Sequence, residues 1–140
     1  MSVYIVDASV AAKWFTEEDH AQAALRLIQG GDPLHVPDFF LLEMDNLICK
    51  WIRQGMISEP EGENLRATLK TLPLNLHSIA NLQDSAFLIA NQTRRSVYDC
   101  LYIALAVALN GQMVTADRRL FEGLKDGPFA GRVVWIEDLV

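Results

Sequence analysis

The chain has 140 residues, of which 51% are apolar and 21% are charged, and its formal net charge is −6. This length can bury a sizeable core in one domain, and the composition is ordinary for a globular protein. A negative charge argues mildly against a nucleic-acid partner, unless several of the acids gather around a cation. We expect a single domain over residues 1–140.

The sequence also lacks the patterns of secreted, membrane and zinc proteins. Asp7 interrupts the first apolar stretch too early for a signal peptide, and the apolar run at residues 100–109 is too short to span a bilayer. Cys49 and Cys100 form no CxxC pair, and the three histidines have no zinc-ligand spacing. We therefore expect a cytoplasmic protein.

Strand and helix patterns alternate along the first part of the chain. Residues 3–6 form an apolar strand that stops at Asp7, and a short helix is predicted over residues 8–15. A second helix is predicted over residues 16–31, with acids at its start and two glycines at its end. Residues 34–36, between two prolines, predict a short strand.

The middle of the chain predicts more helix. A long helix is expected over residues 38–55, and another over residues 58–70, where Ser58 has a glutamate three residues later in the pattern of a capping box. Residues 74–76 predict a short strand and residues 78–93 a helix.

Near the end, a helix is predicted over residues 98–111, a strand over 112–115, a helix over 118–125 and a strand over 132–136. This alternation predicts an α/β fold, with a central parallel sheet of about four to five strands covered by helices on both faces.

Three aspartates stand where elements meet. Asp7 directly follows a predicted strand and Asp117 lies just past another, at the sheet edge where ligands collect in such folds, and Asp99 heads a very apolar helix. Each also precedes a predicted helix, so helix capping, which contributes about 0.5–2 kcal/mol, explains each of them as well as a functional role does. The two roles are compatible, because one carboxylate oxygen can cap while the other binds a cation.

Capping does not explain Glu43, which lies inside a long helix that is apolar nearly all round. Asn46 and Lys50 fall on the same helical stripe. Because an unpaired buried carboxylate is costly, either Lys50 or a cation should lie beside Glu43. Both explanations remain open.

Four acids that converge at one sheet edge would repel one another unless a divalent cation neutralised them. Oxygen ligands without histidine or cysteine suit Mg²⁺ or Mn²⁺ rather than zinc. The candidate ligands, called the acidic quartet below, are Asp7, Glu43, Asp99 and Asp117.

Four motifs resemble those of the PIN-domain ribonucleases, and above all the VapC-type toxins of toxin–antitoxin systems: "VDAS", "LLEMDNL", "SVYDCLYIALA" and "MVTADRRL". They occur in the family's order and span nearly the whole chain. The resemblance implies a PIN-like fold in which the acidic quartet holds the metal, with Ser9, Asn46 and Thr115 in support. No acid directly follows Asp117, so a fifth carboxylate that some relatives carry is not expected.

The implied activity is a Mg²⁺- or Mn²⁺-dependent endoribonuclease that leaves a 5′-phosphate and a 3′-hydroxyl. The ion would lower the pKa of a water and stabilise charge on the phosphate. The implied partners are an RNA substrate, a cognate antitoxin and a second copy of the chain. Candidate RNA-binding residues, each also readable as a solvated surface charge, are Lys13, Arg94, Arg95, Arg118 and Arg119.

Other protein classes share part of this acidic pattern. A haloacid-dehalogenase-type phosphatase needs a second aspartate where Ser9 stands, and a response-regulator receiver domain needs a lysine where the late strand is followed by arginine. A catalytically degenerate PIN-like binding module has no reason to keep four acids.

The apolar helix at residues 38–55 is either fully buried or part of a homodimer or antitoxin surface. Core packing is expected, ahead of base stacking, for Trp14, Phe15, Tyr98 and Tyr102.

Overall fold

The computed structural model describes residues 2–139. One sheet lies at its centre, with the strand order β3-β2-β1-β4-β5 and parallel pairing throughout. The strands are β1 (Tyr4–Val6), β2 (Leu34–Pro37), β3 (Leu74–His77), β4 (Gln112–Thr115) and β5 (Val133–Trp135). The predicted α/β fold with a parallel sheet is confirmed, at the upper end of the expected strand number.

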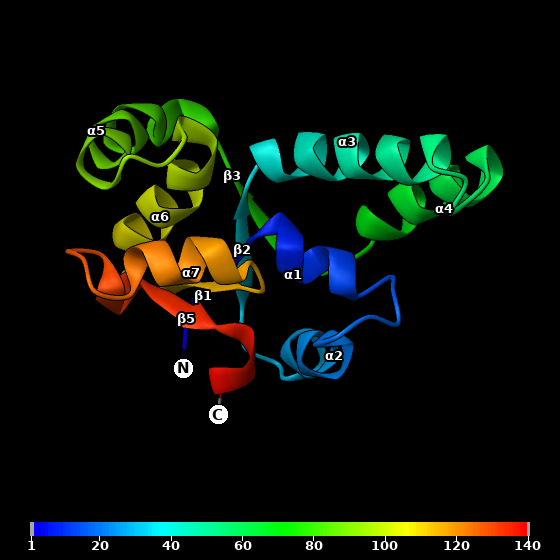
Figure 1. Ribbon diagram of the computed structural model, residues 1–140, viewed down its shortest axis with the longest axis horizontal. Helices are drawn as coiled ribbons and strands as arrows, with labels where there is room; N and C mark the ends of the chain where they lie inside the picture. The colour runs from blue at the N-terminus through cyan, green and yellow to red at the C-terminus, as the bar shows by residue number, and fades with distance from the viewer. Residues whose placement is uncertain (1, 140) are drawn as a thin grey trace.

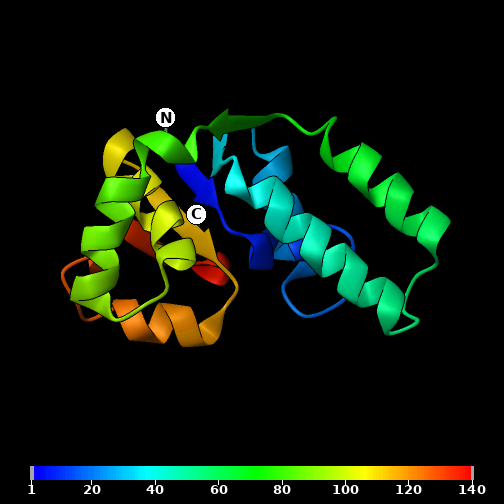
Figure 2. The same cartoon turned by 90° about the horizontal axis from the view of Figure 1, so that it is seen from above.

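Helices lie on both sides of the sheet (Figure 1). One side has α1 (Ala8–Lys13), α2 (Ala21–Gln29), α3 (Phe39–Arg53) and α4 (Glu59–Leu69), and the other has α5 (Gln83–Thr93), α6 (Val97–Leu109) and α7 (Arg118–Leu124). Three short 3₁₀ helices complete the described chain: η1 (Ile79–Asn81), η2 (Ala130–Arg132) and η3 (Ile136–Asp138). Seen from above, α3 and α4 extend together away from the sheet (Figure 2).

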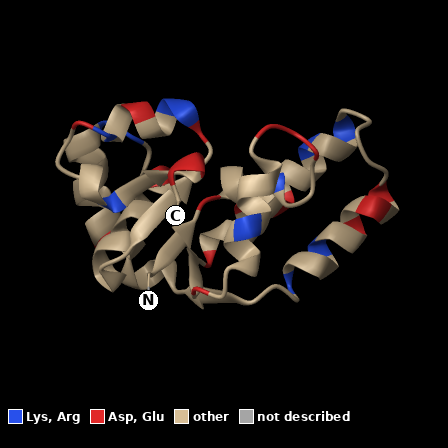
Figure 3. Ribbon diagram, turned by 90° about the horizontal axis from the view of Figure 1, so that it is seen from below, with Lys and Arg blue, Asp and Glu red and all other residues tan. Residues whose placement is uncertain are grey.

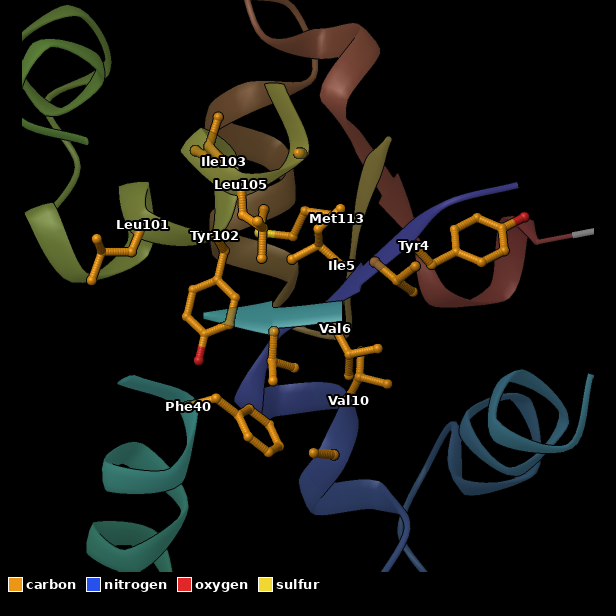
Figure 4. Close-up of a cluster of buried hydrophobic side chains, with 14 of the residues drawn as sticks. Tyr4, Ile5, Val6, Val10, Phe40, Leu101, Tyr102, Ile103, Leu105 and Met113 are labelled. Atoms are coloured by element: carbon orange, nitrogen blue, oxygen red, sulfur yellow. The ribbon is translucent and has the colours of Figure 1, made fainter. Parts of the chain in front are cut away.

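The hydrophobic core has two layers, one on each face of the sheet. Ile5 and Met113 meet Leu105 of α6 on one face, whereas Val6 and Phe40 lie on the other (Figure 4). Helix α6 is buried continuously over residues 100–106. The very apolar helix that Asp99 heads is therefore buried along its middle, whereas Tyr98 and Val107 near its ends are exposed.

Two predicted helices have different bounds in the structure. The helix predicted over residues 16–31 begins only at Ala21, because His20 has a left-handed backbone (φ 72°) that a helix cannot contain. Glu18, in the segment before it, forms an ion pair of 2.9 Å with Lys13. The helix predicted over residues 78–93 is divided at Leu82 into η1 and α5.

The capping box of α4 is confirmed. The Ser58 hydroxyl accepts a hydrogen bond from the Glu61 amide at 3.2 Å, and the Glu61 carboxylate accepts one from the Ser58 amide at 3.0 Å. Helix α3 is only partly buried: Phe40 and Met44 lie in the core, but Leu42 is 63% exposed. The fully buried alternative for this helix is therefore wrong. Within residues 2–139, no helix is long and apolar enough to cross a membrane.

Candidate active site

Asp7 is held at the end of β1 by three hydrogen bonds. Its Oδ1 atom accepts from the Ser9 hydroxyl at 2.5 Å and from the Val10 amide at 3.1 Å, and its Oδ2 atom accepts from the Thr115 hydroxyl at 2.5 Å. The bond from Val10 caps α1, as the sequence predicts. Asp7 is only 6% exposed, and burial is the main cause that raises its pKa to about 6, against the lowering effect of its hydrogen bonds.

Ser9 and Thr115 also connect the ends of the two central strands. The Ser9 hydroxyl accepts from the Ala116 amide at 3.0 Å, and the Thr115 hydroxyl accepts from the Asp117 amide at 3.1 Å. Asp117 in turn caps α7 through a 3.1 Å bond from the Leu120 amide, and its side chain is exposed. Two segments more than 100 residues apart in sequence are thus fixed against each other around Asp7.

Glu43 points from α3 toward α6. Its Oε1 atom accepts a short hydrogen bond from the Tyr102 hydroxyl, which is directed at the start of α3 (Figure 4). Burial raises the pKa of Glu43, the bond from Tyr102 lowers it, and the charges of Asp7 and Asp99 raise it further. Among the described residues Glu43 forms no ion pair with Lys50, so the first of the two explanations left open by the sequence does not hold.

Asp99 is the third residue of α6, and it is not the cap. The capping residue is Ser96, whose hydroxyl accepts from the Asp99 amide at 3.1 Å, so the capping explanation is wrong for Asp99. Its carboxylate lies 3.8 Å from Nε of Arg95. Burial raises the pKa of Asp99, Arg95 lowers it, and the charge of Asp117 raises it again.

The charges of the four carboxylates act on one another in pairs. The charge of Asp117 raises the pKa of Asp7 and that of Asp99, while the charges of Asp7 and Asp99 raise the pKa of Glu43. Each acid comes from a different part of the chain: the ends of β1 and β4, the first half of α3, and the first turn of α6. The fold therefore gathers like charges without a matching number of basic groups.

The donor set suits a hard divalent cation. Oxygen is its only ligand atom, and within residues 2–139 no hydrogen bond reaches Oε2 of Glu43, Oδ1 of Asp99 or Oδ2 of Asp117. As the side chains stand, no three His, Cys, Asp or Glu residues of the described chain are placed to hold an ion together. Joint coordination requires rotation, for which the partly exposed Asp99 and the exposed Asp117 have room.

Two hollows meet at Glu43 and Asn46, which line both. The first, called the lysine hollow, has a volume of about 520 Å³ and is also lined by Ser9, Lys13, Lys50 and Asp117. The second, called the aromatic hollow, has a volume of about 660 Å³ and is also lined by Phe39, Leu42, Asp45 and Tyr98. The predicted supporting residue Asn46 thus lies one helical turn from Glu43, on the same face.

The PIN-domain family model matches residues 4–125. This chain belongs to the PIN-domain family. Ribonuclease VapC3 of Pyrobaculum aerophilum is 33% identical over 120 residues, which cover 84% of this chain and 92% of that protein. Among solved structures, PAE2754 from Pyrobaculum aerophilum has a TM-score of 0.71 at 22% identity, over 97% of this chain and 85% of the other. A toxin–antitoxin complex from Klebsiella pneumoniae has a TM-score of 0.66 at 13% identity, over 99% and 100%.

Lysines and arginines of this PIN domain are spread over several helices (Figure 3), and the five candidates come from α1, α7 and the segment between α5 and α6. Lys13 lines the lysine hollow but is paired with a glutamate, and Arg95 lies beside the acidic quartet. Arg118 lies 3.8 Å from the ring centroid of a tryptophan. Arg94 and Arg119 are exposed. Of the five, Lys13 and Arg95 have contacts that place them next to the site.

The aromatic residues divide differently from the expectation. Trp14, Phe15 and Tyr102 pack in or against the core, as predicted, but Tyr98 is 61% exposed, so core packing is wrong for it. The bond between Tyr102 and Glu43 was not foreseen. A signal for it exists, because Tyr102 follows Asp99 by three residues and so lies on the same face of α6.

Proposed function

We propose that this PIN-domain protein is a Mg²⁺- or Mn²⁺-dependent endoribonuclease and the toxin of a type II toxin–antitoxin pair. The observation that carries the proposal is that the acidic quartet gathers at the carboxyl edge of the parallel sheet, close enough for the charges of Asp7, Asp99 and Asp117 to raise the pKa of neighbouring members. The relative named Ribonuclease VapC3 supports RNA as the substrate, and the toxin–antitoxin complex supports an antitoxin partner. Residues 1–140 act as one PIN domain, and the proposed place of action is the cytoplasm.

The acidic quartet would hold the ion. When bound, a divalent cation lowers the pKa of a water and stabilises charge on the attacked phosphate. The chain's own residues prepare this site: Ser9 and Thr115 fix the Asp7 carboxylate, and the Tyr102 hydroxyl orients that of Glu43. These bonds leave little freedom to two of the four ligands, which reduces the entropic cost of binding an ion.

The lysine hollow is the proposed place of the RNA backbone. Lys13 and Lys50 line it together with Asp117, so positive charge lies next to the acids without being paired to them directly. Lysine ammonium groups bind phosphate as point charges. In the same proposal the chain forms a homodimer.

Cleavage of a 5′-labelled unstructured RNA tests the proposal. We expect cleavage with Mn²⁺ or Mg²⁺, none with excess EDTA, and products with a 5′-phosphate and a 3′-hydroxyl. Asp99→Asn should lower the rate at least a hundredfold. Asp84→Asn is the matched control, because Asp84 also lies in the first turn of a helix but outside the quartet. Equal rates for Asp99→Asn and the wild-type chain, or cleavage that persists in EDTA, would exclude the quartet.

A second test addresses the toxin role. Induced expression of the wild-type chain in a bacterial host should arrest growth, and Asp99→Asn should not. Isothermal titration calorimetry with Mn²⁺ separates the nuclease from a degenerate binding module, which should show no carboxylate-dependent binding of the ion.

A further inference from the structure

Tyr98 presents a supported aromatic surface at the edge of the site. Its ring stacks on that of Phe39, with 5.1 Å between centroids and an angle of 15° between the planes. Phe39 comes from the start of α3 and Tyr98 from the start of α6, so the pair bridges two elements that also carry Glu43 and Asp99. With one face against Phe39 and 61% of its area exposed, Tyr98 must leave its other face open to solvent.

The charges around the aromatic hollow decide what it can accept. Glu43 and Asp45 line it, Asp45 is paired with Arg66 at 2.5 Å, and the lining itself includes no lysine or arginine. A phosphate group therefore meets no lining cation there and lies beside Glu43, whereas an uncharged planar group can enter. The lysine hollow on the other side of Glu43 differs, because Lys13 and Lys50 line it together with Glu43 and Asp117 and offset their charges.

We propose that Tyr98, supported by Phe39, is the platform on which a base next to the cleaved phosphate stacks. This inference rests on the proposed nuclease function and adds to it a residue that positions substrate. A nucleotide joins a charged phosphate to a flat neutral base, and the two adjoining hollows place lysines on one side of Glu43 and a stacked aromatic pair on the other. Stacking on an aromatic ring suits any base and favours the larger purines, so the platform predicts single-stranded RNA with a purine preference.

Binding of 5′-fluorescein-labelled 12-mers of oligo(rA) and oligo(rU), followed by anisotropy, tests the platform. All variants carry Asp7→Asn as well, so that the RNA is not cut. Tyr98→Ala should weaken oligo(rA) binding about 5- to 100-fold and reduce the preference over oligo(rU). Tyr98→Phe should bind within about twofold of the parent, because the ring is kept. Phe87→Ala is the matched control: Phe87 is 60% exposed and lines neither hollow.

Several outcomes would overturn the platform. Unchanged binding by Tyr98→Ala, or equal losses in Tyr98→Phe and Tyr98→Ala, would exclude ring stacking. If sedimentation shows that Tyr98→Ala converts a dimer to a monomer as RNA binding falls, the surface is a contact between copies of the chain. If the wild-type chain cleaves RNA while Tyr98→Ala binds normally, the platform fails and the nuclease stands. A wild-type chain that neither binds nor cleaves either RNA removes both proposals.

Discussion

The buried carboxylate of Asp7 should make the metal-free protein less stable at neutral pH than at acid pH. Burial raises the pKa of Asp7 from 3.8 to about 6, so between these values the folded chain holds a proton that the unfolded chain has lost. The stability that this proton contributes is fully present below the unfolded pKa and is lost as the pH rises through the folded one. The loss amounts to about 3 kcal/mol at pH 7, from about 1.4 kcal/mol for each pKa unit.

Asp7→Asn removes this titration. The asparagine carbonyl can still accept from Ser9 and Val10, but the Thr115 hydroxyl loses its acceptor, at a cost of about 1 kcal/mol. We therefore expect the free energy of unfolding to rise by about 2 kcal/mol at pH 7 and to fall by about 0.4 kcal/mol at pH 4, where the wild-type chain has lost only about 0.6 kcal/mol. Urea denaturation in EDTA between these pH values measures both changes, with Asp126→Asn as an exposed control.

The reasoning is refuted if the difference between Asp7→Asn and wild type does not change with pH. The same samples with Mn²⁺ provide a second check. At a concentration of one hundred times the dissociation constant, the ion should stabilise the wild-type chain by about 2.7 kcal/mol and reduce its pH dependence. Asp7→Asn should gain much less, because it lacks one of the four carboxylates.

Three other variants test the fold and the charge balance of the site. Arg94→Gly should stabilise the protein by about 0.5–1 kcal/mol in thermal denaturation, because Arg94 ends α5 in a left-handed conformation (φ 59°); no gain would show that the position is unstrained. Gly111→Ala should cost about 1–3 kcal/mol, because its Cβ would lie 2.5 Å from a backbone oxygen, whereas Gly131→Ala should be nearly neutral in the same assay. Arg95→Gln removes the cation beside Asp99 and should tighten Mn²⁺ binding in calorimetry. Weaker binding would show that Arg95 does not compete with the ion for the Asp99 carboxylate.

Much of the fold could be predicted because its signals are local. The strands that end at Asp7 and Thr115 are short apolar runs with an abrupt polar end, and the capping box at Ser58 needs only four consecutive positions. The parallel sheet follows from the alternation of elements. The predictions that were wrong concerned places where neighbouring residues compete for one role or where the backbone conformation decides. Ser96 outcompetes Asp99 as the cap from three residues away, and a backbone conformation at His20 delays the start of α2.

The site could be predicted as a set of residues but not as an arrangement. The sequence marks Glu43 as an acid that needs a partner, yet its partner Tyr102 lies 59 positions away and is brought to it only by packing of α6 against the sheet. His35 and His77 look scattered, but β2 and β3 place their ring nitrogens 2.9 Å apart. The exposure of Tyr98 could not be predicted from the sequence either, because only the fold shows that the start of α6 projects past the buried part of the helix.

At Asp7 the free-energy magnitudes favour a role beyond helix capping. A capping bond to α1 contributes about 1 kcal/mol, and Asp117 makes the same kind of bond to α7 while its side chain remains exposed. Burying Asp7 costs about 3 kcal/mol at neutral pH, so capping alone cannot explain why the fold removes this carboxylate from water. A bound cation changes the balance, because it favours the ionised form that burial opposes. The free energy lost at Asp7 in the metal-free chain is thus the physical reason to expect an ion there.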